Sequence, residues 1–298
     1  MSGPVLDGIF VPNVTPFTRQ GDLDVEALRA CIRFWVENGV SGLVPCGSNG
    51  EAPYLSREER SKVISIVVDE VNGRIPVIAG TGSLSTQETI SLTRDAKNLG
   101  VDAVLIVTPF YFKLTDREII AHYRAVLDSV NIRIVVYNAP KFTGFSLNPE
   151  VIHQLARENE QVAGVKDSSG NIDTITEIVR LVGSRVSVLA GAADIALSSF
   201  SLGSRGAVLA VANVFPTTCK RLYEAFRNNK LDEATRLQKR ITVANDLLVK
   251  RYNQLSTIKE ALNTIGLPAG YPRRPALPLK SEEKAAVQEF VKTMSDIE

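Results

Sequence analysis

The sequence has few of the residues that bind metals or form cross-links. Its three cysteines, Cys31, Cys46 and Cys219, lie far apart and form no Cys-x-x-Cys pair, which argues against a disulfide framework and against a cysteine zinc site. The two histidines, His122 and His153, lie apart in segments with helical patterns. Their separation argues against a shared metal site. Their positions in helical segments argue against a Ser-His-Asp triad, whose base would have to be one of the two. We therefore predict no bound metal, and a reducing, cytoplasmic compartment.

An excess of one charge sign and long apolar runs are also missing. The formal net charge is +1, so neither a nucleic-acid-binding field nor an acidic tail is indicated. No apolar run approaches the ~20 residues that cross a bilayer, and residues 1–10 lack the pattern of a signal peptide. Hydrophobic residues make up 44% of the chain, which is typical of a soluble globular protein. We expect no nucleic-acid partner and no membrane association.

A repeated unit organises most of the chain. Short apolar runs without polar alternation indicate parallel strands buried on both faces; they are Ile9–Val11, Leu43–Pro45, Val77–Ala79, Ala103–Val107, Ile134–Tyr137, Val162–Val165, Val186–Leu189 and Ala207–Val211. Helical patterns lie between them, and several open with the capping-box pattern S/T-x-x-E, at residues 56–59, 85–88 and 115–118. Asn148-Pro149 marks another helix start.

Eight strand-helix units in series predict a (β/α)8 barrel, a fold that typically takes ~250 residues. An open doubly wound sheet is the alternative. It is less favoured because no G-x-G-x-x-G motif follows the first predicted strand.

We assign residues 1–226 to the barrel and residues 227–298 to a C-terminal helical extension packed on it. Apolar residues between Leu231 and Leu248 recur at three- and four-residue intervals with no strand between them. Two more helical patterns run over Thr257–Ile265 and Ser281–Met294. A separate binding domain is the alternative, but the segment is short for one.

Active sites of such barrels lie where the strands end, and Lys166 follows the apolar run Val162–Val165. Its amine should point into the mouth of the barrel, where burial lowers the pKa of an amine. A neutral amine is the nucleophile that forms a Schiff base with a ketone. Tyr137 ends the neighbouring strand, where a phenol can relay protons. The structural alternatives are a lysine paired with a carboxylate such as Asp167 and a tyrosine that is simply packed.

The turn between Gly47 and Gly50 follows the second predicted strand. Ser48 and Asn49 would offer a hydroxyl and backbone N–H groups to a carboxylate, although such turns are common. Glu51 would brace this turn. A phosphate-binding barrel is the competing hypothesis. It is less favoured because Gly191 is followed by Ala192-Ala193 and the eighth strand by Ala212-Asn213, which do not form a glycine-rich phosphate cradle.

Five motifs at strand ends, in this order, give the chain a specific resemblance. It resembles the pyruvate-dependent class I aldolases, which include dihydrodipicolinate synthase and N-acetylneuraminate lyase, over nearly its whole length. The motifs are Gly47-Ser48-Asn49-Gly50-Glu51, Ile78-Ala79-Gly80-Thr81-Gly82, Thr108-Pro109-Phe110-Tyr111, Tyr137-Asn138-Ala139-Pro140 with Thr143-Gly144, and Gly164-Val165-Lys166-Asp167.

The resemblance implies a role for each matching residue. Lys166 would form the imine with pyruvate, and Tyr137 would shuttle protons. Ser48 and the backbone N–H of Asn49 would hold the pyruvate carboxylate. Tyr111 would reach into the site of a partner subunit, which implies a homodimer or homotetramer. The implied partners are a 2-oxo acid and an aldehyde, and no metal or organic cofactor is implied.

One departure bears on the substrate. Dihydrodipicolinate synthases usually carry an arginine where Phe142 stands here, and a phenyl ring cannot replace a guanidinium that binds a carboxylate. We expect the side chain of the adjacent Lys141 to point elsewhere. The segments Leu189-Ala190-Gly191 and Lys166–Gly170 look closer to 4-hydroxy-2-oxoglutarate and 2-keto-3-deoxy sugar acid aldolases. Gly191 and Phe142 are therefore predicted to line the substrate pocket.

The predicted reaction is cleavage or formation of a 4-hydroxy-2-oxo acid, giving or consuming pyruvate and an aldehyde. Two other enzymes stay open: a 4-hydroxy-tetrahydrodipicolinate synthase and a 2-keto-3-deoxy acid dehydratase, which uses the same imine but loses a hydroxyl. A non-enzymatic alternative is a silent barrel that binds a 2-oxo acid. The intact set of Lys166, Tyr137, Ser48 and Tyr111 argues against it.

Overall fold

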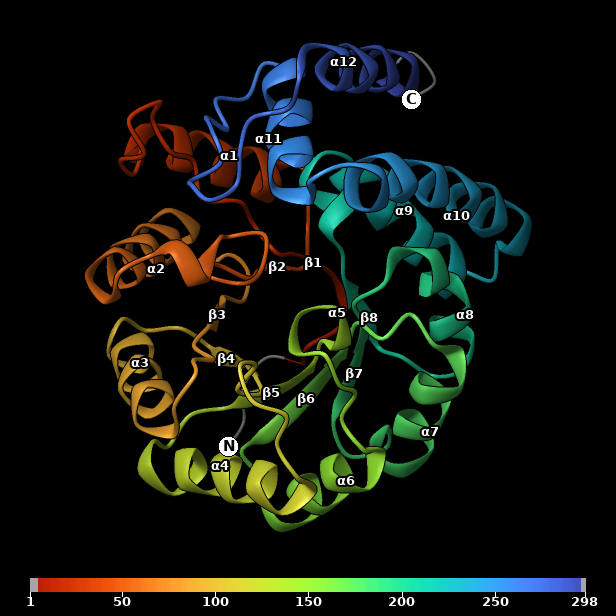
Figure 1. Cartoon of the computed structure of the whole chain (residues 1–298). Helices are drawn as coiled ribbons and strands as arrows, with labels where there is room; N and C mark the ends of the chain where they lie inside the picture. Colours follow the sequence, from red (N-terminus) through yellow and green to blue (C-terminus); the bar gives the residue numbers. More distant parts are fainter. Residues whose placement is uncertain (1–4, 296–298) are drawn as a thin grey trace.

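The computed structural model describes residues 5–295 and forms a barrel of eight parallel strands ringed by helices (Figure 1). Neighbouring strands follow the order β2-β1-β8-β7-β6-β5-β4-β3, and a parallel bridge between Leu43 and Val77 joins the two ends of this order. This confirms the predicted (β/α)8 fold. The strands are β1 Gly8–Val11, β2 Gly42–Leu43, β3 Ile78–Gly80, β4 Ala103–Val107, β5 Ile134–Asn138, β6 Val162–Asp167, β7 Ser187–Ala190 and β8 Gly206–Val208.

Several helices of the barrel begin at capping residues, including all four whose starts the sequence predicts. Ser56 and Thr115 form reciprocal capping boxes, whereas Ser85 accepts only from the N–H of Glu88. Asn148 caps the helix that starts with Pro149, as predicted. The α-helices are α1 Val25–Glu37, α2 Arg57–Val71, α3 Thr86–Asn98, α4 Asp116–Ser129, α5 Pro140–Thr143, α6 Pro149–Glu158, α7 Ile172–Val182, α8 Ala196–Ser201 and α9 Pro216–Arg227, with short 3-10 helices η1 Ala52–Tyr54, η2 Ala193–Ile195 and η3 Ala210–Asn213.

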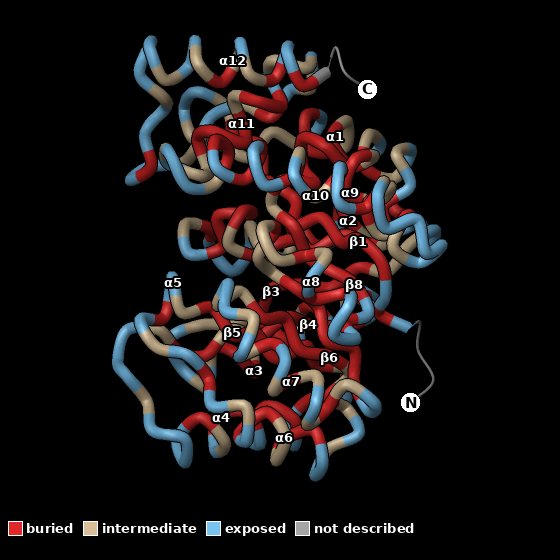
Figure 2. The backbone as a smooth tube through the Cα atoms, turned by 90° about the vertical axis from the view of Figure 1, so that its right-hand side faces the viewer, coloured by how far each residue is buried: buried red, intermediate tan, exposed pale blue. Residues whose placement is uncertain are grey.

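The strands are buried on both faces, which explains their uniformly apolar sequences. Figure 2 shows buried segments along the middle of the molecule and exposed turns around it. Trp35 of α1 is fully buried, and its indole N–H donates to the carbonyl of Asn213 at 2.9 Å. None of the helices within residues 5–295 combines the length and apolar character needed to cross a membrane.

The eighth strand is shorter than the predicted Ala207–Val211. It ends at Val208, and the chain then turns into η3. The side-chain amide of Asn213 donates to the carbonyls of Pro12 and Ala210 at 3.0 and 3.1 Å, and its oxygen accepts from the N–H of Val14 at 3.2 Å. The bonds with Pro12 and Val14 tie η3 to the end of β1, a tertiary contact that apolar periodicity cannot reveal.

The last part of the chain is helical. It comprises α10 Leu231–Asn245, a π-helix η4 Asp246–Arg251, α11 Gln254–Thr264 and α12 Ser281–Ser295. Helix α11 begins three residues before the predicted start because the Asn253 side chain accepts from the N–H groups of Leu255 and Ser256. This helix packs against α12 (Figure 1) and also against η4 and η3. The division of the chain at residue 226 stays a prediction.

Candidate active site

Two strand-end residues, Tyr137 and Lys166, lie directly opposite each other in the β5–β6 register. Both side chains are 5% exposed, and the Lys166 Nζ lies 4.1 Å from the centre of the Tyr137 ring. The next register pair, Asn138 and Asp167, belongs to the opposite face because side chains alternate along a strand. The barrel therefore brings the predicted nucleophile and the predicted proton relay together.

The Asp167 carboxylate is hydrogen-bonded to residues other than Lys166. The Asn138 side-chain amide donates to one of its carboxylate oxygens and the Ser169 hydroxyl to the other, each at 2.6 Å. Burial raises the pKa of Asp167, and these hydrogen bonds oppose that effect. Within the described part of the chain, Lys166 has no carboxylate at ion-pair distance. The alternative of a structural Lys166–Asp167 pair is therefore wrong.

The environment of the Tyr137 hydroxyl lowers its pKa. Burial alone would raise its pKa, but the positive charge of Lys166 and hydrogen bonds with Ser168, Ser48 and Lys166 outweigh burial and lower the pKa. The Ser168 hydroxyl lies 3.4 Å from the phenol oxygen. Ser168 was not singled out in the sequence, although its position two residues after Lys166 on the same chain segment was an available signal.

Residues of the C-terminal segment contact the turn that carries Ser48 and Asn49 and the Glu51 that follows it. The residue that follows this turn, Glu51, is buried, adopts φ 56° and accepts from the Lys259 ammonium of α11 at 2.5 Å. The second Glu51 oxygen accepts from the backbone N–H of Arg273 at 2.8 Å. The side-chain amide of Gln254 donates to the Asn49 side-chain oxygen. Glu51 therefore braces the turn, as predicted, through partners that are remote in sequence.

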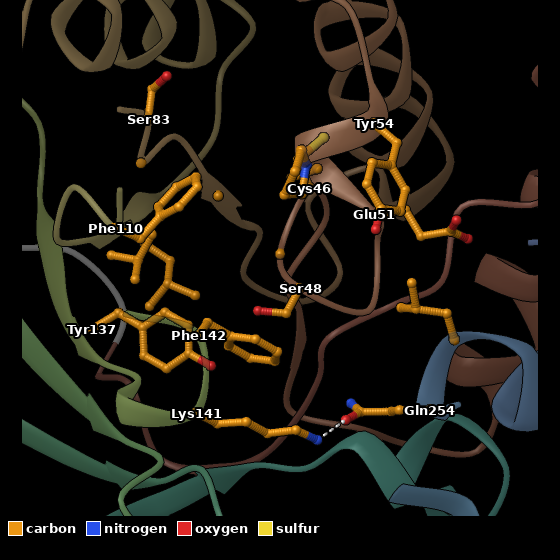
Figure 3. Close-up of a pocket in the computed structure, with 18 of the residues that line it drawn as sticks. Cys46, Ser48, Glu51, Tyr54, Ser83, Phe110, Tyr137, Lys141, Phe142 and Gln254 are labelled. Atoms are coloured by element: carbon orange, nitrogen blue, oxygen red, sulfur yellow. Dashed lines mark hydrogen bonds between the residues drawn. The ribbon is translucent and has the colours of Figure 1, made fainter. Parts of the chain in front are cut away.

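Two adjoining cavities open at this end of the barrel. The smaller, of about 320 Å³, is lined by six of the seven predicted site residues: Lys166, Tyr137, Ser48, Asn49, Gly191 and Phe142. The larger, of about 750 Å³, shares Ser48, Tyr137 and Phe142 with it and continues toward Tyr54, Ser83 and Phe110 (Figure 3). The seventh residue, Tyr111, lines neither cavity and is 78% exposed beside Phe112.

Gly191 lies against the predicted nucleophile. A Cβ atom at this position would stand 2.0 Å from the Ser168 hydroxyl oxygen and 3.1 Å from the Cε of Lys166. Any side chain here would displace groups around the Lys166 amine. Gly191 thus leaves open space beside the Lys166 amine.

The expectation for Lys141 was wrong. Its side chain lines both cavities and donates to the Gln254 side-chain oxygen at 3.1 Å (Figure 3). Residues from the C-terminal helices, Val249, Lys250 and Gln254, also line both cavities. No motif marked them, because they reach the site only through the packing of η4 and α11 on the barrel.

The fold and this arrangement define a class of protein. A (β/α)8 barrel whose strands end in a buried lysine, a neighbouring tyrosine of lowered pKa and a facing serine has the groups needed for amine-based chemistry on a carbonyl compound. The class is that of the barrel aldolases.

Comparison with known proteins identifies the family. The dihydrodipicolinate synthetase family profile matches residues 5–294. The chain is 37% identical over 286 residues to the 4-hydroxy-tetrahydrodipicolinate synthase of Pelobacter propionicus, covering 96% of this chain and 98% of that protein. It is also 37% identical over 291 residues to the enzyme of the same name from Methanothrix thermoacetophila, covering 97% of each.

Comparison with solved structures supports the same family. YagE, a prophage protein of the dihydrodipicolinic acid synthase family from E. coli K12 solved in complex with pyruvate, superposes with a TM-score of 0.94 at 29% identity, covering 98% of this chain and 99% of YagE. The dihydrodipicolinate synthase of Aquifex aeolicus gives 0.93 at 34% identity, covering 97% and 98%. The chain belongs to the dihydrodipicolinate synthetase family, and it is a carbon–carbon lyase of the lysine Schiff-base, class I aldolase type.

Proposed function

We propose that the protein cleaves or forms a 4-hydroxy-2-oxo acid, with pyruvate as one product or substrate and an aldehyde as the other. The observation that carries this proposal is the Lys166–Tyr137 pair, with the Lys166 Nζ 4.1 Å from the tyrosine ring in a cavity that Ser48 and Asn49 also line. Lys166 is the proposed nucleophile, Tyr137 the proton relay, and Ser48 with the Asn49 backbone N–H the carboxylate holder.

The proposed chemistry follows from these groups. The Lys166 amine attacks the C2 ketone, and loss of water leaves a protonated imine. Tyr137 takes the proton from the C4 hydroxyl, the C3–C4 bond breaks, and its electron pair flows into the imine to give an enamine while the aldehyde departs. Protonation at C3 and hydrolysis then release pyruvate and restore the amine. Condensation runs through the same steps in reverse.

A 4-hydroxy-tetrahydrodipicolinate synthase is the second candidate, supported by the names of relatives that are 37% identical. Phe142 lines the cavity at the position where the resemblance leads us to expect an arginine, and this favours the 4-hydroxy-2-oxo acid. A 2-keto-3-deoxy acid dehydratase would use the same imine. Product analysis separates the three, since only the proposed aldolase releases pyruvate from a 4-hydroxy-2-oxo acid.

We further propose that the protein is a homodimer or homotetramer in which Tyr111 enters the partner's site. The supporting observation is that Tyr111 and Phe112 are 78% and 73% exposed and stack edge to face beyond β4. Large exposed aromatic side chains are typical of protein interfaces.

Borohydride trapping tests the Schiff base. Pyruvate is added, the mixture is reduced, and the modified peptide is located by mass spectrometry. We expect a pyruvate-sized adduct on Lys166, none in Lys166→Ala, and an undiminished adduct in Lys141→Ala, the matched control that removes another lysine from the same cavity. An adduct scattered over surface lysines, or none at all, would overturn the proposed nucleophile and favour a silent 2-oxo acid binder.

A further inference from the structure

The charges around the catalytic cavity are unbalanced. The ionisable lysine and carboxyl side chains that line the smaller cavity are Lys141, Lys166, Lys250 and Asp194. With Lys166 charged, as an ammonium or as the protonated imine, and Tyr137 neutral, three lysines against one aspartate leave a formal excess of two positive charges. Such a cavity attracts anions, and a substrate with two carboxylates would match the excess. The proposed pyruvate end of the substrate supplies one carboxylate. A second carboxylate, at the other end of the substrate, would need its own cation in the cavity.

Of the three lysines that line the smaller cavity, Lys141 is the one free to receive the second carboxylate. Lys250 already forms an ion pair with Asp194, and Lys166 is the proposed nucleophile. The contacts of the Lys141 ammonium within residues 5–295 are both uncharged: the Gln254 amide oxygen at 3.1 Å and the Phe142 ring at 5.7 Å from its centre. An ammonium held by neutral groups at the wall of a cavity retains its full capacity to pair with an incoming anion.

Gln254 places Lys141 relative to the pyruvate-binding turn. Its amide nitrogen donates to Asn49, and its oxygen accepts from Lys141. A continuous polar connection therefore runs from the turn that would hold the first carboxylate to the ammonium that would hold the second. Figure 3 shows Lys141 reaching toward Gln254, with Ser48 and Tyr137 lining the same cavity.

We propose that Lys141, positioned by Gln254, is a specificity-determining residue that binds a carboxylate on the aldehyde half of the substrate. This inference rests on the proposed function and narrows it: the substrate is a 4-hydroxy-2-oxo acid with a second, distal carboxylate, rather than a neutral sugar-like chain. In the condensing direction the aldehyde partner is an aldehyde acid.

Two substrates that differ only at the far end test the assignment. One is 4-hydroxy-2-oxoglutarate, and the other is 4-hydroxy-2-oxopentanoate, which has a methyl group in place of the distal carboxylate. We expect Lys141→Met to lower kcat/KM for the dicarboxylate by about tenfold and to change that for the monocarboxylate by less than about twofold. Lys141→Arg keeps the charge and should keep the preference. The control is Lys239→Met, an exposed lysine on α10 outside both cavities, which should change neither.

Added salt should reduce the preference of the unmodified protein for the dicarboxylate, since an exposed ammonium is screened. Condensation of pyruvate with aspartate semialdehyde forms a third arm. A Lys141→Met effect in that arm, with none on 4-hydroxy-2-oxoglutarate, assigns the bound carboxylate to the semialdehyde. Equal losses on all substrates would overturn the role of Lys141. So would the absence of any loss on the two substrates that carry a carboxylate on the aldehyde half.

The trapping experiment distinguishes failure of the role assigned to Lys141 from failure of the proposed function. If pyruvate is trapped on Lys166 in every variant but Lys141→Met shows no discrimination, only the specificity assignment fails. If the unmodified protein traps no pyruvate, the proposed function fails, and the narrower inference fails with it.

Discussion

At the scale of single residues, the Tyr137 hydroxyl combines burial with a lowered pKa. Because the Lys166 charge and three hydrogen bonds lower the pKa of Tyr137, the phenolate becomes populated at a lower pH than in free tyrosine. The proposed cleavage uses this phenolate as the base. The rate of cleavage should therefore rise with pH through a range below the ordinary tyrosine pKa of about 10.

Tyr137→Phe tests this role. The variant removes the hydroxyl but keeps the ring against Lys166, so we expect kcat to fall by about 100-fold or more and the rise of kcat with pH to disappear. Thermal unfolding followed by circular dichroism provides the control for intact folding. A variant that retains both the rate and its pH dependence would show that another group moves the proton.

At the scale of elements, the pair formed by Glu51 and Lys259 joins the turn that carries Ser48 and Asn49 to α11. Both side chains are at most 1% exposed, and the two partners lie 208 residues apart in sequence. Removing one partner leaves an uncompensated buried charge. We expect Lys259→Met to reduce the free energy of unfolding by about 3 kcal/mol, measured by urea denaturation.

The double variant Glu51→Gln/Lys259→Met distinguishes pairing from packing. It should lose less stability than the sum of the two single variants, because neither charge remains unpaired. Losses that simply add would indicate that the two residues contribute to packing independently of their pairing.

At the scale of the whole molecule, the position of Tyr111 predicts complementation between inactive chains. Tyr111→Phe and Lys166→Ala should each lack most activity alone. If Tyr111 enters the partner's site, hybrids made by unfolding and refolding a mixture contain one complete site per dimer, and about a quarter of the unmodified activity should return. Mass measurement by light scattering must show at least two chains of 32.4 kDa. No recovery in proven hybrids would place Tyr111 outside the partner's site.

The sequence by itself determined the barrel and most of the candidate site. Apolar runs without alternation, capping residues and motifs at strand ends are local signals, and they placed all eight strands and the Lys166–Tyr137 pair. These signals suffice because parallel strands end at one edge of the barrel, so residues that terminate neighbouring strands meet there.

Only the tertiary structure decided which remote residues complete the cavity. Gln254 and Lys250 reach it through the packing of α11 and η4, and Lys141 turns toward Gln254 across 113 residues of sequence. Such contacts depend on how a helix sits on the barrel, which no local periodicity specifies. For the same reason the apolar pattern predicted neither the early end of β8 nor the hydrogen bonds that join Asn213 to the end of β1.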